Sequence, residues 1–394
     1  MITLEAARER LLAAVTVLEA EVVALAGAGG RVLADGVVAP SSLPPFDSSA
    51  MDGYAVRSVD AKLGARLTVI GSAPAGRVFP NRVGAGHCVR VYTGSPLPDG
   101  TDAVVMQEDV RLVPAANEIE VMDAPKPWEN VRFQGEDVRS GNYVLPARHR
   151  LQPQSLGLLT ALGVDAVRVF RRPRVVLLPN GSELVAPGNG RLPGQIYESN
   201  SPMLASLIEA QGCSVTVMHP PDDDLTEVQA ALGWAFERGD VVITLGGASV
   251  GDWDLVRPAL HNLGGVTEFW KLAIKPGKPF FFGTFEGKHL LGLPGNPVSA
   301  FVTCVLLVLP VLRKMAGDGS PALRISAETL GEELSNQESR RHFFRVSTHE
   351  GGIVRASGSQ ASHLLHGLAM ADGLVDVAPG TVLAAGTRVP VIRW

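Results

Sequence analysis

The chain has 394 residues, a formal net charge of -5 and only 19% charged residues. A chain of this length exceeds one ordinary hydrophobic core, so we expect two to four domains, and the slightly acidic balance argues against a nucleic-acid-binding face. The three cysteines are widely spaced and form no CxxC pair, which argues against a disulfide framework or a zinc knuckle and favours a reducing, cytoplasmic location.

No targeting or membrane segment is expected. The N-terminus is a charged, amphipathic stretch without the pattern of a secretory signal. The longest apolar run, Phe301 to Leu312, is short for a bilayer span and contains Pro310. We therefore expect a soluble protein with no membrane partner.

The first part of the chain shows three different sequence patterns. Residues 3 to about 20 carry leucine and valine at helical spacing, which predicts a helix that needs a partner surface. From about residue 40 to 141, short β-type runs alternate with Gly, Pro, Asn and Asp, a pattern typical of a small, mainly-β domain inserted into the surrounding chain. Residues 142–172 hold two short strands around a leucine-rich helix, Gln154–Leu162.

From Arg174 to about Met315, strands alternate with helical segments. The predicted strands are Arg174–Leu178, Ser214–Met218, Asp240–Leu245 and His289–Leu293. Asn200 and Ser201 precede Pro202 at one helix start, and Asp224 forms a capping box with Glu227 at another. The alternation predicts a doubly wound, largely parallel sheet, which binds ligands beyond the carboxyl ends of its strands. After a linker at 317–321, short β runs return and predict a barrel or sandwich.

The first candidate site is the stretch TLGGASVGDWDLV, which follows an apolar strand. Its glycines let the backbone approach a ligand closely, and Asp252 and Asp254 suit a cation or a donor-rich ligand. A glycine turn with solvated aspartates fits the same residues. The place of this stretch at the carboxyl end of a strand in an α/β sheet favours a functional site.

Two further stretches suit an anion. After the last strand of the α/β region, Asn296 can cap a helix whose first turn holds Pro297, and a helix N-terminus attracts anionic groups. The Pro-Gly turn at 276–277 brings Lys275 and Lys278 onto one loop, where two cations can clamp an oxyanion. An ordinary capped helix and a solvated turn are the alternatives.

Weaker candidates lie elsewhere. Glu183 follows the first strand of the α/β region and suits an amine-bearing ring or the water shell of a metal. Polar turns at 48–57 and 92–98 interrupt the β-rich region, and the segments 343–345 and 358–363 offer an arginine and a hydroxyl to an oxyanion. Singly, each fits a surface turn as well. The sequence has no GxSxG, HExxH or paired-cysteine motif.

Taken together, an ordered set of motifs resembles one family. The motifs are SAMDGYAVR, YTGSPLP, GED, GSEL, QIYESN, GGASVGDWD, FWKLAIKPGKP and LPGNPVSA. They are similar, in the same order, to those of the molybdopterin molybdenumtransferases, which carry out the last step of molybdenum cofactor synthesis and are the bacterial counterparts of the gephyrin C-terminal domain. The resemblance covers nearly the whole chain.

The resemblance implies an architecture of four parts. These are an α/β domain of the molybdopterin-binding type, an inserted mainly-β domain, a connecting segment and a C-terminal β barrel. We place the limits at 1–45 and 141–172 for the N-terminal helix and connecting segment, 46–140 for the inserted domain, 173–318 for the α/β domain and 319–394 for the barrel.

The resemblance also implies a reaction. Such enzymes take adenylylated molybdopterin and molybdate, hydrolyse the pyrophosphate-type link, insert the metal into the dithiolene and release AMP. They use a divalent cation, normally Mg²⁺. A dianionic oxyanion needs hydrogen-bond donors, and phosphate hydrolysis needs a metal that offsets charge.

The site residues that the resemblance implies form four sets. Catalytic positions are Asp52, Thr93, Asp137, Glu183, Asp254, Lys271, Lys275 and Lys278. The molybdate pocket is implied at Lys275, Lys278, Pro279, Arg345 and Ser362. Substrate contacts are implied at Gly246, Gly247, Ser249, Gly251, Pro294, Gly295, Asn296 and Pro297. The magnesium-side carboxylates are Asp254 and Asp223.

One loop departs from the family pattern. The family usually has Thr-Gly-Asp-Glu-Leu where this chain has Asn180-Gly181-Ser182-Glu183-Leu184. The change removes one carboxylate from a loop expected to serve a metal or an adenylate, whereas Glu183 is kept.

The resemblance implies a homodimer with a cleft shared between two chains, small-molecule substrates, and molybdopterin adenylyltransferase as a partner. Two other functions remain open: a non-catalytic scaffold of the gephyrin type and a molybdopterin adenylyltransferase. The scaffold use depends on a fused adenylyltransferase domain, and the lone adenylyltransferase has neither the inserted β domain nor the barrel. The sequence does not separate molybdate from tungstate, because both are tetrahedral dianions of nearly equal size.

Overall fold

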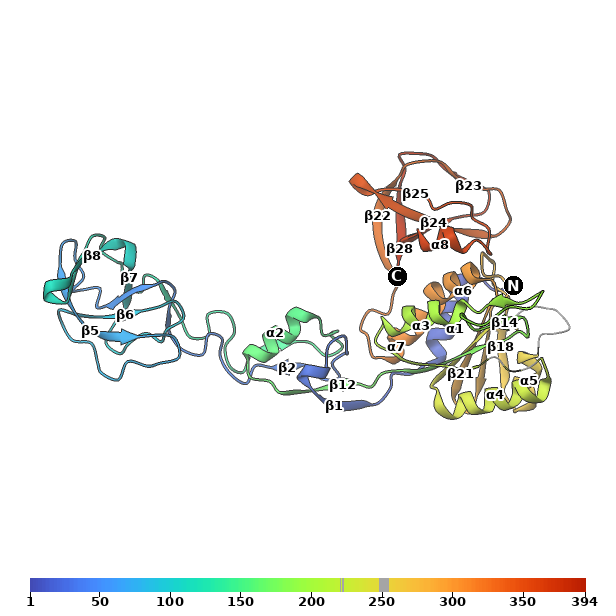
Figure 1. Ribbon diagram of the computed structural model, residues 1–394, viewed down its shortest axis with the longest axis horizontal. Helices are drawn as coiled ribbons and strands as arrows, with labels where there is room; N and C mark the ends of the chain where they lie inside the picture. Colours follow the sequence, from blue (N-terminus) through green and yellow to red (C-terminus); the bar gives the residue numbers. More distant parts are fainter. Residues whose placement is uncertain (220, 222, 248–254) are drawn as a thin grey trace.

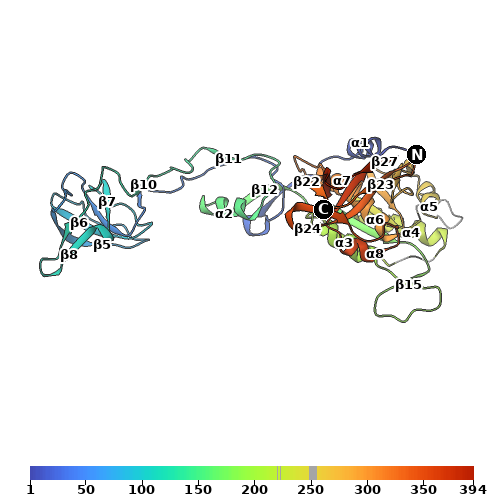
Figure 2. The ribbon, with the colours of Figure 1, turned by 90° about the horizontal axis from the view of Figure 1, so that it is seen from above.

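The computed structural model describes every residue except 220, 222 and 248–254. The molecule is elongated, with a β module at one end and the α/β domain beside the C-terminal barrel at the other (Figure 1). A slender connecting region that contains α2 (Pro153–Ala161) separates the two ends, and the view from above shows the same separation (Figure 2).

The α/β domain is built on six described strands in the spatial order β16-β13-β17-β21-β20-β18. Their bounds are β13 Arg174–Pro179, β16 Ser214–Val217, β17 Val241–Leu245, β18 Val266–Trp270, β20 Phe281–Phe285 and β21 Lys288–Leu293. The four strands from β16 to β21 are parallel, β20 is antiparallel to β21, and β18 is antiparallel to β20. The predicted doubly wound, mainly parallel sheet is confirmed, with an antiparallel edge that the strand pattern did not indicate.

Helices cover both faces of this sheet because successive strand residues point to opposite sides. Val175 and Leu177 join one buried core, and Val176 and Leu178 join the other. The first core includes residues of α1 (Leu4–Ala14), α3 (Asn200–Glu209), α6 (Pro297–Thr303) and α7 (Leu309–Met315). The second includes residues of α4 (Leu225–Arg238) and α5 (Val256–Asn262). The N-terminal helix thus finds its partner surface on the α/β domain.

The two predicted helix starts differ in how they are capped. The Asp224 carboxylate accepts the backbone N–H of Thr226 at 2.8 Å and of Glu227 at 3.2 Å, as expected for the start of α4. At α3 the cap comes from upstream: Glu198 Oε1 accepts the N–H groups of Asn200 and Ser201, both at 2.9 Å. A carboxylate there satisfies two orphan donors at once.

One helical stretch is long and apolar enough to span a membrane by length and composition alone. It runs from Pro297 to Met315, longer than the apolar run noted in the sequence, and 94% of its most apolar window is buried inside the protein. It is therefore the central core helix of the α/β domain. Its middle, Cys304–Val308, is a π-helical turn. Pro310 has no backbone N–H to donate to the Leu306 carbonyl, and this carbonyl accepts a hydrogen bond from Arg8 Nε at 3.4 Å instead.

The inserted module has its own sheet and its own two buried cores. Its strand order, with all of 46–140 described, is β7-β4-β6-β5-β9-β8. The bounds are β4 Gly53–Val56, β5 Arg66–Ala73, β6 His87–Val91, β7 Ala103–Met106, β8 Val110–Val113 and β9 Glu118–Val121. The two-residue strands β3 (Ser48–Ser49) and β10 (Val131–Arg132) pair at the base of the module.

The connecting region is a small body around α2. It pairs β1 (Ala20–Ala24) with β12 (Ala166–Phe170), and β2 (Val37–Val38) with β11 (Tyr143–Leu145). The predicted helix at 154–162 is present, shifted by one residue at each end.

The C-terminal region, described throughout, closes into a barrel. Its ring of five strands runs β24-β25-β22-β28-β26 and back to β24. The bounds are β22 Arg324–Leu330, β24 Arg341–His349, β25 Ile353–Ala356, β26 Gly373–Val377 and β28 Arg388–Arg393. A strand of the α/β domain, β19 (Ile274–Lys275), pairs in parallel with β24. The predicted barrel is confirmed, and β19 joins it to the α/β domain.

Asp240, immediately before β17, anchors the α/β domain to the connecting region. Its side chain is 10% exposed and accepts Arg171 at 2.6 and 2.9 Å and the Arg174 backbone N–H at 2.8 Å. Burial alone would raise the pKa of Asp240, but these donors outweigh it and lower that pKa to about 2.

Replacing Asp240 by Asn should lower the free energy of unfolding at pH 7 by about 1–3 kcal/mol, because charge-assisted bonds are lost and Arg171 and Arg174 each lose a counter-charge. The folded pKa lies below the ordinary 3.8, so this contribution is complete at neutral pH and declines as the pH falls from near 3.8 toward 2. Urea unfolding at pH 7 and near pH 3 measures the effect. The control is Asp35→Asn, in an exposed pair with Arg168, which should change the free energy by less than about 1 kcal/mol. Equal losses at both positions would contradict the assignment.

Candidate active site

A cleft of about 800 Å³ lies between the α/β domain and the barrel. Its described lining comes from the loop after β13, residues 196–200 at the start of α3, the turn after β19, the start of α6, and the barrel segments near 340 and 360–365. Because β13, β17 and β21 are parallel neighbours, their carboxyl ends meet at one edge of the sheet, and the cleft opens there.

The lysine turn is fixed by close packing. Gly277 has φ +112, and a Cβ there would lie 2.5 Å from Cγ2 of Thr303 in α6, so only glycine fits without displacement. The turn therefore sits directly on the core helix, and Lys275, Lys278 and Pro279 all line the cleft. Lys275 forms an ion pair with Glu338 of the barrel.

The two glycine loops lie against each other. Gly246 has φ +92, and a Cβ there would lie 2.9 Å from the Asn180 carbonyl oxygen, while a Cβ on Gly295 would lie 3.6 Å from Cα of Gly246. Next to them, the Asn296 side chain donates to Ser362 Oγ at 3.2 Å, across the domain boundary. The predicted set Pro294, Gly295, Asn296 and Pro297 thus lines the cleft together with Ser362.

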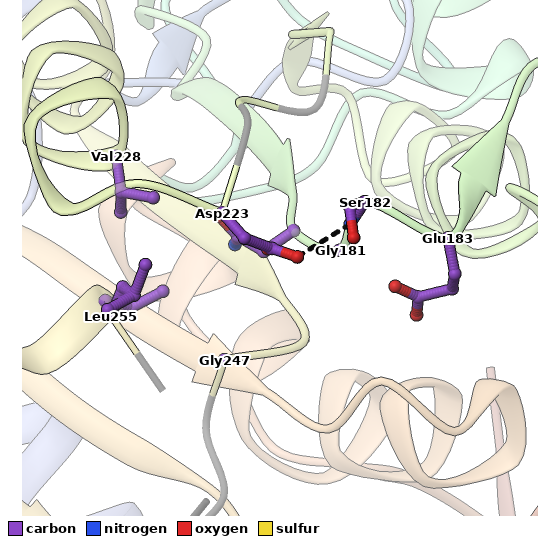
Figure 3. Close-up of a pocket in the computed structure, with 9 residues that line it drawn as sticks. Gly181, Ser182, Glu183, Asp223, Val228, Gly247 and Leu255 are labelled. Atoms are coloured by element: carbon purple, nitrogen blue, oxygen red, sulfur yellow. Dashed lines mark hydrogen bonds between the residues drawn. The ribbon is translucent and has the colours of Figure 1, made fainter. Parts of the chain in front are cut away.

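A second cavity of about 600 Å³ adjoins the first, and Asn180 and Glu183 line both. Asp223 and Gly247 also line it, and the Ser182 backbone N–H donates to Asp223 Oδ2 at 3.2 Å. Figure 3 shows the carboxylates of Asp223 and Glu183 on the two sides of Ser182. The loop 180–184, which lacks the family aspartate, therefore binds the carboxylate of Asp223 from another segment.

The side chains that line this second cavity carry oxygen donors, the type that a hard divalent cation prefers. Asn180 Oδ1 is buried without a hydrogen-bond partner in the described protein, and an amide oxygen with the carboxylates of Glu183 and Asp223 suits magnesium. Among the described residues, no group of three or more His, Cys, Asp or Glu is arranged to hold a metal. Asp254, the other implied magnesium-side carboxylate, lies outside the described residues, as do Ser249 and Gly251.

The structure assigns two arginines of the barrel to different places. Arg345 is 1% exposed, and its guanidinium donates to the carbonyls of Ser359, Ala361 and Leu364. It is not among the described residues that line the cleft, so it holds the loop that carries Ser362. The barrel cation in the lining is Arg340, which the sequence reading missed. The dipeptide Arg340-Arg341 just before a β run was the available signal.

Other predicted residues lie apart from the cleft. The Lys271 ammonium sits 3.7 Å from the centroid of the Trp270 ring, and Lys271 is not in the described lining of either cavity. Asp52 accepts the Thr93 backbone N–H at 2.7 Å and hydroxyl at 2.9 Å, and these bonds lower the pKa of Asp52. Both belong to the inserted module, which lies at the opposite end of the molecule from the cleft (Figure 1). Asp137 lies in a turn whose backbone bonds to Leu43.

Family models match the chain in three blocks. Residues 2–163 match the MoeA N-terminal region (domain I and II), residues 178–314 a probable molybdopterin binding domain, and residues 328–394 the MoeA C-terminal region (domain IV). The fold and the cleft therefore define a multidomain protein with a molybdopterin-binding type α/β domain.

Full-length relatives give the family. The chain is 39% identical over 370 residues to the molybdopterin molybdenumtransferase of Haemophilus influenzae, covering 92% of this chain and 91% of that protein. It is 38% identical over 382 residues to molybdopterin molybdenumtransferase 2 of Mycobacterium tuberculosis, covering 94% of each. The crystal structure of the molybdopterin biosynthesis moeA protein from Pyrococcus horikoshii superimposes with a TM-score of 0.84 at 30% identity over 100% of both chains. The chain belongs to the molybdopterin molybdenumtransferase family of enzymes.

Replacing Arg345 by Ala should free the loop at 359–364 and lower the free energy of unfolding by about 1–3 kcal/mol, because buried carbonyls lose their donor. Hydrogen exchange of this loop should become faster. The matched control is Arg355→Ala, an exposed barrel arginine that donates to the Gly331 carbonyl. Unchanged exchange at 359–364 in the Arg345 variant would contradict the anchoring role.

Proposed function

We propose that the cleft inserts molybdenum from molybdate into adenylylated molybdopterin, with magnesium-dependent hydrolysis and release of AMP, in the cytoplasm. The observation that carries this proposal is the convergence of Lys275 and Lys278 from the α/β domain with Arg340 and Ser362 from the barrel. Three cationic groups and a hydroxyl around one space suit a tetrahedral dianion. The names of the relatives support the same substrate class.

In this proposal each wall of the cleft has a separate task. The lysine turn and Arg340 bind the oxyanion, and Ser362, which is held by Asn296, donates a further hydrogen bond. The glycine loops at Gly246 and Gly295 let the backbone approach the phosphate end of the substrate. Asn180, Glu183 and Asp223 would hold Mg²⁺, which when bound offsets the phosphate charge during hydrolysis.

We also propose that two copies of the chain complete one active site. The inserted module, which contains Asp52 and Thr93, lies at the opposite end of the molecule from the α/β domain and the barrel (Figures 1 and 2). Five apolar residues of the same module and its base are 39–48% exposed: Phe46, Met51, Tyr92, Trp128 and Phe133. Exposed apolar residues on the module that carries this pair favour an interface, and two-fold homodimers are the commonest soluble assembly.

We propose molybdopterin adenylyltransferase as the partner that supplies adenylylated molybdopterin to this cleft.

The activity is tested by incubating the protein with adenylylated molybdopterin, Mg²⁺ and either molybdate or tungstate, and measuring released AMP. The Asp254→Asn variant should lose at least about tenfold of the magnesium-dependent rate, because a carboxylate that offsets phosphate charge is removed. Wild-type AMP release by this variant, with an unchanged magnesium dependence, would refute the metal role. No release by the wild-type protein with either oxyanion would refute the proposed reaction.

The shared site is tested by complementation between Asp52→Ala and Lys275→Ala, which should each be inactive alone. In a mixed dimer one cleft carries both lesions and the other carries neither, so random subunit exchange should restore about a quarter of the wild-type rate per chain. If each chain closes its own site, every cleft keeps one lesion and no activity returns. Native mass spectrometry confirms that exchange has taken place.

A further inference from the structure

One carboxylate bridges two of the three cations of the cleft. Glu338 lies in the barrel just before β24, where Oε1 pairs with the Lys275 ammonium and Oε2 lies 3.5 Å from Nη2 of Arg340. Each carboxylate oxygen therefore faces a different cation. An incoming oxyanion would present its oxygens to the same two groups.

This carboxylate is held in place by the barrel. The buried Asn336 side chain donates to the carbonyls of Arg340 and Val377, both at 2.9 Å, and its oxygen accepts the Glu338 backbone N–H at 3.1 Å. The turn from 336 to 340 is thus fixed at both ends. Arg340 is fixed as well, because its Nη1 donates to the Ile274 carbonyl at 3.0 Å.

The surrounding groups leave Glu338 as the described counter-charge to Lys275 and Arg340. His342 pairs with Lys275 across β19 and β24, and burial, together with the charge on Lys275, lowers the pKa of His342 to about 4, so it is neutral near pH 7. Glu198, which lines the cleft, accepts the backbone N–H groups at the N-terminus of α3. Glu183 lines both cavities, and among the described residues it makes no ion pair with Lys275 or Arg340.

We propose that Glu338 is an internal competitor of the oxyanion: it pairs with Lys275 and Arg340 and must release them when the dianion binds. The inference rests on the proposed oxyanion site and adds the residue that sets its affinity. Glu338 keeps two like charges paired and ordered before binding, and it weakens the hold on the anion so that the anion can leave.

The test is calorimetric titration of the full-length protein with sodium molybdate. Removing the competing charge in Glu338→Gln should tighten molybdate binding by about three- to tenfold, the range expected for displacing one or two part-exposed ion pairs. Glu338→Ala should tighten binding in the same direction. If Glu338 instead only positions Lys275, both variants should bind molybdate more weakly, and that result, or an unchanged affinity, overturns the proposal.

The matched control is Glu350→Gln, which removes an exposed carboxylate from the turn between β24 and β25 of the same barrel. Its molybdate affinity should stay within about twofold of the wild type, because salt screens distant surface charges. The Lys275→Ala variant distinguishes a failure of the proposed oxyanion site from a failure of the competitor role of Glu338. If neither the wild type nor this variant binds molybdate, the proposed oxyanion site fails; if the wild type binds and Lys275→Ala does not, while Glu338→Gln is unchanged, the competitor role alone fails.

Discussion

The cleft depends on the pairing of two short segments from different domains. Ile274 and Lys275 of β19 pair in parallel with Arg341 and His342 of β24, so a strand of the α/β domain becomes part of the barrel sheet. This backbone contact fixes the distance between the lysine turn and the barrel residues opposite it. Beside it, Phe343, Leu368 and Leu374 of the barrel join the buried core of the α/β domain, so the pairing is backed by apolar packing between the two domains. Backbone pairing suits this task because its geometry leaves little freedom in register.

Charge in the cleft is arranged by burial as much as by residue type. The buried Arg345 donates its guanidinium hydrogen bonds to backbone carbonyls and holds a loop, whereas the part-exposed heads of Lys275 and Arg340 pair with Glu338, the carboxylate that we propose an anion displaces. His342 stands beside them, but its burial lowers its pKa to about 4. A basic side chain near the site therefore either faces the cleft or is used for hydrogen bonds inside the barrel. Its position in the barrel decides between these two roles.

The elongated shape gives the inserted module a distinct place in the proposed mechanism. The module folds around its own buried cores and reaches the rest of the chain through the narrow connecting region (Figure 1). Its Asp52–Thr93 pair is pre-formed, since backbone and side chain of Thr93 both donate to the same carboxylate oxygen. A pre-formed pair on an extended module suits a surface that completes a site in another chain, which is the arrangement proposed above.

The sequence by itself determined the elements whose signals are local. Strand–helix alternation from residue 174 onward predicted the parallel sheet, Asp224 marked the start of α4, and the Pro-Gly turn placed Lys275 and Lys278 on one loop. These patterns depend on neighbours within a few residues, so they can be read along the chain. The ordered motifs identified the family for the same reason.

Only the tertiary structure decided which distant residues meet. It gave the cleft Arg340 in place of Arg345, brought Asp223 to the loop that lacks the family aspartate, and set Glu338 against Lys275 across 63 positions of sequence. It also packed α1 onto the α/β core and added the antiparallel edge strands. Arg340, just before β24, and Arg345, within it, look equivalent in a sequence. Their roles diverge because one side chain points into the packed interior, where only carbonyls are within reach, and the other opens toward the cleft.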